Sequence, residues 1–300
     1  MKSKKGLLIY TLVLVLVCSL FVGVKNSGIK SDASGVNTSQ LDLNVDHEIS
    51  VMCQNLRREY TTKDGIGNNT ILRYYRIVNQ FNNYDSDIYC FQECTRVWQV
   101  LLDYTFNNNN YYKIIHYNNN GLATPVYAKK SRFDLFDSGV FNLSDRSSKD
   151  NTENRISCWA KLRDKKTGKT LAVYSGHYAF DHAIQVDSCE KIKEEAAQAN
   201  VDGYIICGDF NFSKINNPKA YGVMSSGETK DLAIAAESEG IQGVTGGTFH
   251  DYGKETNPGR IDFFFGSASI VSKMYTVLND TYDGKYVSDH YGILTYIDIK

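Results

Sequence analysis

A carboxylate and an amide lie two residues apart in Gly208-Asp209-Phe210-Asn211, directly after the apolar run 204–207. In an extended chain, side chains at positions i and i+2 lie on the same side of the backbone, so Asp209 and Asn211 share a side. Such a pair can hold a water molecule and a phosphate oxygen beside a metal ion. Asp and Asn also form ordinary turns after strands, so this run indicates chemistry only in combination with other residues.

Polar side chains also occur at the ends of other apolar runs. Taken singly, each has an ordinary structural explanation: a solvated strand end, a turn, a buried histidine with its own partner, or a helix cap. Open sheets, however, place their binding and catalytic residues where strands end, so the set together predicts a site. The residues concerned are Asn55, Glu93, His177, Asp262, Asp289 and His290.

Short strand-like runs must position these residues. Helical patterns with one apolar stripe separate some of the runs, which predicts two packed β-sheets flanked by helices. The expected strands are 49–56, 87–92, 111–116, 125–129, 133–143, 155–162, 170–177, 203–207, 261–265, 273–278 and 291–297, and the expected helices are 71–81, 182–200, 217–226 and 229–239.

Six motifs along the chain resemble those of the endonuclease/exonuclease/phosphatase superfamily and occur in the order of that family. The resemblance implies a four-layer α/β sandwich of the DNase I-like type, in which two mixed β-sheets are flanked by helices. It also implies a metal-dependent phosphoric ester hydrolase. The motifs are Met52-Cys53-Gln54-Asn55-Leu56-Arg57, Asp87-Ile88-Tyr89-Cys90-Phe91-Gln92-Glu93, His177, Gly208-Asp209-Phe210-Asn211, Arg260-Ile261-Asp262-Phe263 and Ser288-Asp289-His290.

The resemblance also implies a role for each polar residue. Asn55, Glu93 and Asp289 resemble metal-side ligands, and such oxygen donors suit Mg²⁺, with Mn²⁺ as an alternative. Asp209 resembles the residue that orients or deprotonates the attacking water, and Asn211 resembles a contact to a phosphate oxygen. His177 and His290 resemble the pair of histidines that flank the phosphoryl group. Asp262 resembles the carboxylate that orients His290.

The chain departs from the family pattern near His177. Ala179 stands where many relatives carry a carboxylate two residues after the histidine. Asp181-His182 is then either that pair displaced or an unrelated helix start. Two further departures are Gly292, where relatives often carry Pro, and Leu122, where many carry Glu, and we expect altered substrate contacts near Leu122.

The N-terminal segment predicts export. Lysines at positions 2, 4 and 5 precede the apolar run 7–24, so residues 1–26 are typical of a signal peptide or an N-terminal membrane anchor. The positive-inside rule then places the rest of the chain outside the cytoplasm, secreted or anchored to the outer face of the cell membrane. Residues 27–45 read as a flexible linker, and residues 46–300 fit one catalytic domain.

Bulk composition limits the function classes. A net charge of −1 weighs against tight, non-specific nucleic-acid binding. Seven cysteines include one pair with metal-knuckle spacing, Cys90 and Cys94, but no second such pair, which argues against a zinc site. The cysteine pattern leaves room for one disulfide and excludes a fold built on disulfides.

Three functions therefore remain open. The first is an exported Mg²⁺-dependent phosphodiesterase, with a nuclease preferred over a sphingomyelinase, a phospholipase or a small phosphoester hydrolase, because no long aromatic hairpin for a bilayer is evident. The second is a phosphomonoesterase, which needs a basic pocket that the sequence does not locate. The third is a non-enzymatic binding module, which has no need of all eight polar residues. The expected partner is a phosphodiester, either nucleic acid or phospholipid, and the chain is expected to be a monomer.

Overall fold

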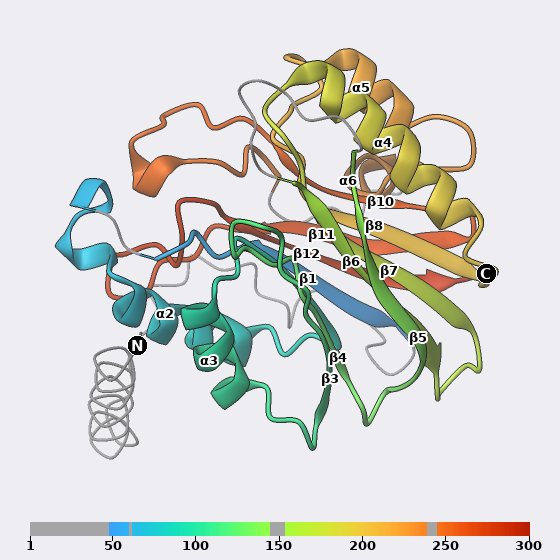
Figure 1. Cartoon of the computed structure of the whole chain (residues 1–300), viewed down its shortest axis with the longest axis horizontal. Helices are drawn as coiled ribbons and strands as arrows, with labels where there is room; N and C mark the ends of the chain where they lie inside the picture. The colour runs from blue at the N-terminus through green and yellow to red at the C-terminus, as the bar shows by residue number, and fades with distance from the viewer. Residues whose placement is uncertain (1–47, 60–61, 145–153, 239–244) are drawn as a thin grey trace, which may run out of the picture.

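The architecture follows from strands whose alternate side chains face two different cores. In strand β1 (Ile49–Asn55), Val51 and Cys53 belong to the core between the two sheets, whereas Met52 belongs to the core under the helices. A strand buried on both faces in this way must lie inside a layered sandwich. This computed structural model describes residues 48–59, 62–144, 154–238 and 245–300, and Figure 1 shows the two sheets packed against each other.

Each sheet has six strands. The first sheet has the order β11-β12-β1-β2-β4-β3 and the second β5-β6-β7-β8-β10-β9. The other strands are β2 (Ile88–Gln92), β3 (Tyr111–Ile114), β4 (Val126–Lys129), β5 (Phe133–Asn142), β6 (Ile156–Asp164), β7 (Thr170–His177), β8 (Gly203–Asp209), β9 (Lys230–Asp231), β10 (Asp262–Gly266), β11 (Ile270–Leu278) and β12 (Gly292–Ile299).

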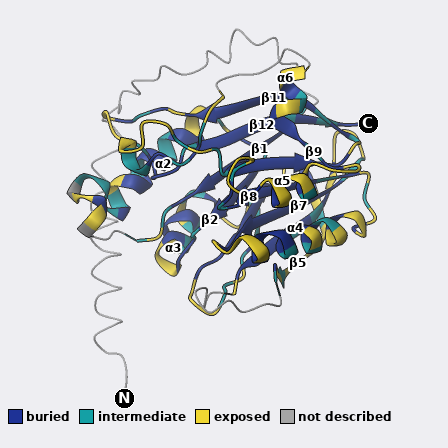
Figure 2. Cartoon of the chain, turned by 90° about the horizontal axis from the view of Figure 1, so that it is seen from above, coloured by how far each residue is buried: buried dark blue, intermediate teal, exposed yellow. Residues whose placement is uncertain are grey.

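Helices cover both outer faces of the sandwich, as Figure 2 shows by the buried strands between partly exposed helices. Helices α2 (Thr70–Asn83) and α3 (Arg96–Thr105) pack on the first sheet. On the second sheet lie α4 (His182–Ala197) and α5 (Pro218–Met224), and α6 (Leu232–Ser238) joins the core between the sheets. The predicted four-layer α/β sandwich is therefore confirmed.

The strand pairing brings the candidate residues to one edge of the sandwich. Strands β7 and β8 are parallel, with His177 opposite Asp209, and β10 runs antiparallel to β8, with Asp262 opposite Asp209. In the first sheet β1 and β2 are parallel, with Asn55 opposite Gln92. Parallel strands end at the same edge and an antiparallel neighbour begins there, so residues far apart in sequence become neighbours.

Most predicted elements are observed, and one helix was not predicted. The run 170–177 coincides with β7, and the helix expected at 71–81 lies within α2. Helix α3 was missed, although Thr95 caps it and Trp98, Leu101 and Leu102 are its buried face. Asp181 accepts hydrogen bonds from the Ala183 and Ile184 backbone amides, so Asp181-His182 is a helix start.

The expected signal or anchor segment 1–26 and the linker 27–45 lie outside the described residues, as does Cys18. The six cysteines that the structure describes are buried and free. Across the described ranges, no helix combines the length and the apolar character that crossing a membrane requires.

Candidate active site

Asp209, at the end of β8, is the buried centre of the candidate site. Its side chain reaches both histidines, with Oδ2 3.4 Å from His177 Nε2 and 3.8 Å from His290 Nε2. Asn55 donates a hydrogen bond from Nδ2 to the same oxygen at 2.9 Å. Both sheets thus contribute to one polar cluster. His177 and Asp209 end strands of the second sheet, Asn55 ends β1 of the first sheet, and His290 lies just before β12 of the first sheet.

The environment of Asp209 favours its protonated form. Burial raises the pKa of this carboxyl group, and the negative charges of Asp262 and Glu93 act in the same direction. The charge of His290 and the hydrogen bond from the Asn211 amide act against them. A carboxyl group with a raised pKa is a stronger proton acceptor than an ordinary aspartate, which suits a general base.

His290 forms a charge pair with Asp262. The Nδ1 atom of His290 lies 2.9 Å from Asp262 Oδ2, and since a carboxylate only accepts, the proton is on Nδ1. Burial alone would lower the pKa of His290, but Asp262 and Asp209 raise it above its ordinary value. His290 therefore carries a positive charge in the resting protein, and its Nε2 faces Asp209.

His177 has the opposite surroundings. Its Nδ1 lies 2.9 Å from Nη1 of Arg155, a buried arginine just before β6. Burial, the Arg155 charge and the His290 charge all lower the pKa of His177 well below its ordinary value. One histidine of the site is thus neutral while the other is cationic.

Asn211 is fixed by the tight turn that follows β8. Its backbone has a positive φ of 52°, a left-handed conformation that Asn tolerates better than most residues. Its amide N–H donates to Asp209 Oδ1 at 2.9 Å, and its side-chain Nδ2 donates to the Tyr178 carbonyl at 2.8 Å. The turn therefore holds Asp209 and Asn211 together at the strand end, as the sequence spacing indicated.

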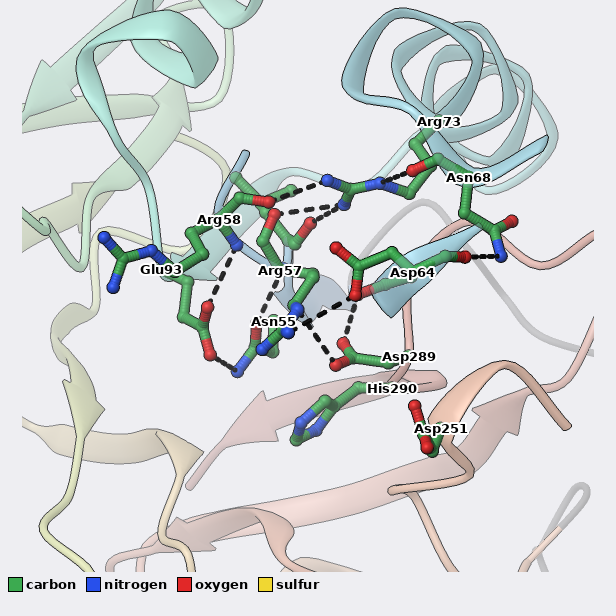
Figure 3. Close-up of polar contacts among 12 residues, drawn as sticks. Asn55, Arg57, Arg58, Asp64, Asn68, Arg73, Glu93, Asp251, Asp289 and His290 are labelled. Carbon is green, nitrogen blue, oxygen red and sulfur yellow. Dashed lines mark hydrogen bonds and ion pairs between the residues drawn. The ribbon is translucent and has the colours of Figure 1, made fainter. Parts of the chain in front are cut away.

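Glu93 and Asn55 meet at the ends of the parallel strands β1 and β2. Asn55 Nδ2 lies 3.4 Å from Glu93 Oε1, and the Arg58 backbone N–H donates to Glu93 Oε2 at 2.9 Å (Figure 3). Glu93 also has a positive φ of 54°. These contacts orient a partly exposed carboxylate at the edge of the site.

Arg57 lies among the acidic groups of this edge (Figure 3). Its Nε is 3.4 Å from Asp289 Oδ2, and its Nη2 is 3.3 Å from Asp64 Oδ1. Burial would lower the pKa of Arg57, but Asp289, Glu93 and Asp64 raise it. Arg57 is thus a counter-charge to Asp289, a predicted metal ligand.

The residue types of the predicted metal side suit a divalent cation, since Asn55, Glu93 and Asp289 carry amide and carboxylate oxygens, the chemistry that Mg²⁺ prefers. In this structure Asn55 Oδ1 accepts a hydrogen bond from the Arg57 backbone N–H at 2.8 Å, and Asp289 Oδ2 lies 3.4 Å from Arg57 Nε. A second group could also hold a metal, because ligand atoms of Asp209, Asp262 and His290 lie within 4.8 Å of one another. In that group one Asp262 oxygen is already bonded to His290, whereas Asp262 Oδ1 is buried without a hydrogen-bond partner among the described residues.

A family model for the Endonuclease/Exonuclease/phosphatase family matches residues 67–290. The chain belongs to this family, whose members are phosphoester hydrolases that typically use a divalent metal, and it is a phosphoesterase of that class. No curated protein matches it.

Solved structures share the fold at low sequence identity. An endonuclease/exonuclease/phosphatase from Bacteroides vulgatus is 21% identical, with a TM-score of 0.75, over 84% of this chain and 99% of that one. A mannosyl-6-phosphatase from Bacteroides thetaiotaomicron is 23% identical, with a TM-score of 0.73, over 84% and 100% of the two chains. TDP2 from D. rerio, solved with a single-strand DNA product, is 16% identical with a TM-score of 0.65, over 84% and 100%.

The sequence identified the residues of this cluster but missed two of their partners. Arg155 contacts His177 and Arg57 contacts Asp289 through side chains, and Asp64 pairs with Arg57 in turn. Their contacts depend on strand pairing and loop paths, which spacing along the chain does not reveal.

Proposed function

We propose that this protein is an exported, Mg²⁺-dependent phosphodiesterase that cleaves nucleic acid. The observation that carries the proposal is the buried Asp209 carboxylate within 3.4 Å of His177 and 3.8 Å of His290. A general base between two imidazoles matches the needs of in-line attack by water on phosphorus.

Each side chain has a distinct task in this reaction. Water forms the new bond to phosphorus as the bond to the leaving oxygen breaks, and Asp209 takes up the proton of the attacking water. His290, held as a cation by Asp262, stabilises negative charge on a non-bridging oxygen. His177 faces the same phosphoryl group, and Asn211 contacts a further phosphate oxygen.

The metal belongs with the oxygen donors of Asn55, Glu93 and Asp289. When bound, a divalent ion supplies positive charge that stabilises the oxygens of the reacting phosphate. Asn55 orients Glu93 and Asp209 together through one amide group, at 3.4 Å and 2.9 Å. Asn55 thereby fixes the position of the predicted metal ligand Glu93 relative to the proposed base Asp209.

An exposed aromatic ring near the site supports a nucleic-acid substrate. Phe180 follows His177 by three residues and is 71% exposed, in contrast to the buried Tyr178 between them. Exposed aromatic rings stack on nucleobases regardless of sequence. The net charge of −1 supports weak rather than processive binding. The TDP2 structure, solved with a single-strand DNA product, is a fold relative and supports the same choice.

The first prediction tests metal-dependent catalysis. Glu93→Gln removes a carboxylate from the metal side and lowers Mg²⁺ affinity about 10- to 100-fold, with a fall in the hydrolysis of bis-p-nitrophenyl phosphate. Calorimetric titration with Mg²⁺ and initial rates measure the two effects. Glu190→Gln on the exposed side of α4 is the matched control and leaves both unchanged.

The substrate is tested on plasmid DNA, RNA, sphingomyelin and mannose 6-phosphate in parallel. We expect nicking of DNA or cleavage of RNA in the presence of Mg²⁺. If only the lipid or only the sugar phosphate is cleaved, the nuclease proposal is wrong and the protein has that other activity. No turnover of any phosphoester would instead favour a binding module. Export is tested separately, by finding the protein outside the cytoplasm after cell fractionation.

A further inference from the structure

The chemistry of Arg155 restricts the protonation state of His177. Arg155 is 6% exposed, and its Nη1 lies 2.9 Å from His177 Nδ1. A guanidinium group only donates hydrogen bonds and does not lose its proton in proteins. At this distance His177 Nδ1 must therefore accept, so it carries no proton.

The other ring nitrogen then holds the only proton of a neutral ring. His177 Nε2 lies 3.4 Å from Asp209 Oδ2, so its N–H is directed at the carboxylate of the proposed base. A charged His177 would place a second cation against the Arg155 guanidinium in a buried site, which is energetically unfavourable. His177 cannot take a proton from water at Nε2 in this state.

We infer that Arg155 is a positioning residue that fixes His177 as the neutral Nε2–H tautomer, so that His177 acts as a hydrogen-bond donor and not as a base. The inference deepens the proposed function. It rests on that function for one assignment, namely that a phosphate oxygen of the substrate accepts the His177 hydrogen bond. It divides the work of the two histidines: His290 supplies charge, and His177 supplies a neutral N–H to Asp209 in the resting site and to a phosphate oxygen in the substrate complex.

Local packing keeps Arg155 in this place. Its Cζ lies 5.7 Å from the centre of the Phe180 ring, which covers the guanidinium from the exposed side. Strand β6 pairs with β7 with Ser157 opposite Gly176, and this register brings the residue before β6 to the end of β7. Arg155 is thus placed to act through His177.

The test is the ring protonation of His177, read from long-range ¹H–¹⁵N spectra of the full-length protein labelled at its histidines. The chain has six histidines, so His177→Gln assigns the signal by its loss. We expect Nδ1 unprotonated and Nε2 protonated at pH 7 in the resting protein. An Nδ1–H tautomer or an imidazolium at His177 would overturn the inference, whether or not the protein hydrolyses any phosphoester.

A variant pair tests whether Arg155 is the cause. In Arg155→Met, Nδ1 loses its donor and the repelling charge, so we expect its signal to move toward the protonated position and kcat to fall about 10-fold, with a smaller change in KM. Arg163→Met changes an exposed arginine within β6, the strand that Arg155 precedes, and leaves the His177 signals unchanged. Unchanged His177 signals in Arg155→Met would refute the role of Arg155. If Arg155→Met does not fold, the spectra of the unmodified protein still decide the tautomer.

Discussion

At the scale of the residue, His290 and Asp262 act as one unit because a single hydrogen bond of 2.9 Å joins them. The unit stabilises charge only while Asp262 keeps the imidazole oriented and positive. His177, next to Arg155, has the reverse environment. Two histidines of the same type thus differ in charge because their Nδ1 partners differ.

The second prediction is a double-mutant cycle on this pair. His290→Ala lowers kcat about 10²- to 10⁴-fold, the range for loss of a positioned acid–base group. Asp262→Asn lowers it less, since the imidazole remains but loses its charge partner. The double variant is no slower than His290→Ala alone, because residues of one unit do not add. The kcat of each variant is measured with bis-p-nitrophenyl phosphate. If the losses of the two single variants add in the double variant, His290 and Asp262 do not act as one unit.

At the scale of the element, the parallel strands β7 and β8 approach closely at their carboxyl ends. Gly208 has a φ of +147°, and a Cβ at this position would lie 1.9 Å from the Gly176 carbonyl oxygen. No other residue type fits there, since both the backbone angle and the space require glycine. This close approach places Asp209 directly opposite His177.

The third prediction follows from this contact. Gly208→Ala destabilises the protein by about 3 kcal/mol or more, because the added methyl group must move backbone atoms apart. Gly222→Ala in α5 is the matched control, since no described atom lies within 4 Å of the added Cβ. Alanine favours a helix over glycine by up to about 1 kcal/mol, so this variant is neutral or stabilised. Urea unfolding measures the free energy of unfolding of both variants. Equal values for Gly208→Ala and Gly222→Ala would contradict the close contact between Gly208 and Gly176.

At the scale of the whole molecule, a buried ion pair lies where the chain crosses from the first sheet to the second. Arg132, between β4 and β5, donates from Nε to Asp164 Oδ1 at 2.6 Å and from Nη2 to Oδ2 at 3.1 Å. Thr167 and the Lys166 amide also donate to this carboxylate. Burial alone would raise the pKa of Asp164, but these hydrogen bonds and the Arg132 charge lower it below the ordinary value of an aspartate.

The fourth prediction concerns stability against pH. A carboxylate with a lowered folded pKa stabilises the protein above its unfolded pKa, and the contribution is lost as pH falls through the folded pKa. Asp164→Asn therefore costs about 3–5 kcal/mol at pH 7, because the buried Arg132 charge loses its carboxylate counter-charge. The difference from the unmodified protein shrinks below about pH 4. Urea unfolding at pH 7 and pH 3 measures it, and a cost that does not change with pH would argue against the pair.

Strand positions were largely predictable, because period-two alternation is a local property of the sequence. Helix α3 was not predicted, although its capping residue Thr95 and its apolar spacing are visible afterwards. Two of its apolar residues, Val97 and Val100, lie on the exposed side of the helix, and this weakens the helical period. Short strands such as β9, with two residues, carry no period at all.

The sequence by itself determined which residue types end the strands and the order in which the motifs occur, because both are local patterns. It thereby indicated the fold class and most of the polar cluster around Asp209. Only the tertiary structure decided that Arg155 contacts His177 and that Arg57 lies between Asp289 and Asp64. These pairings depend on strand register and loop paths, and a side chain's charge depends on its neighbours in space and not on those in sequence.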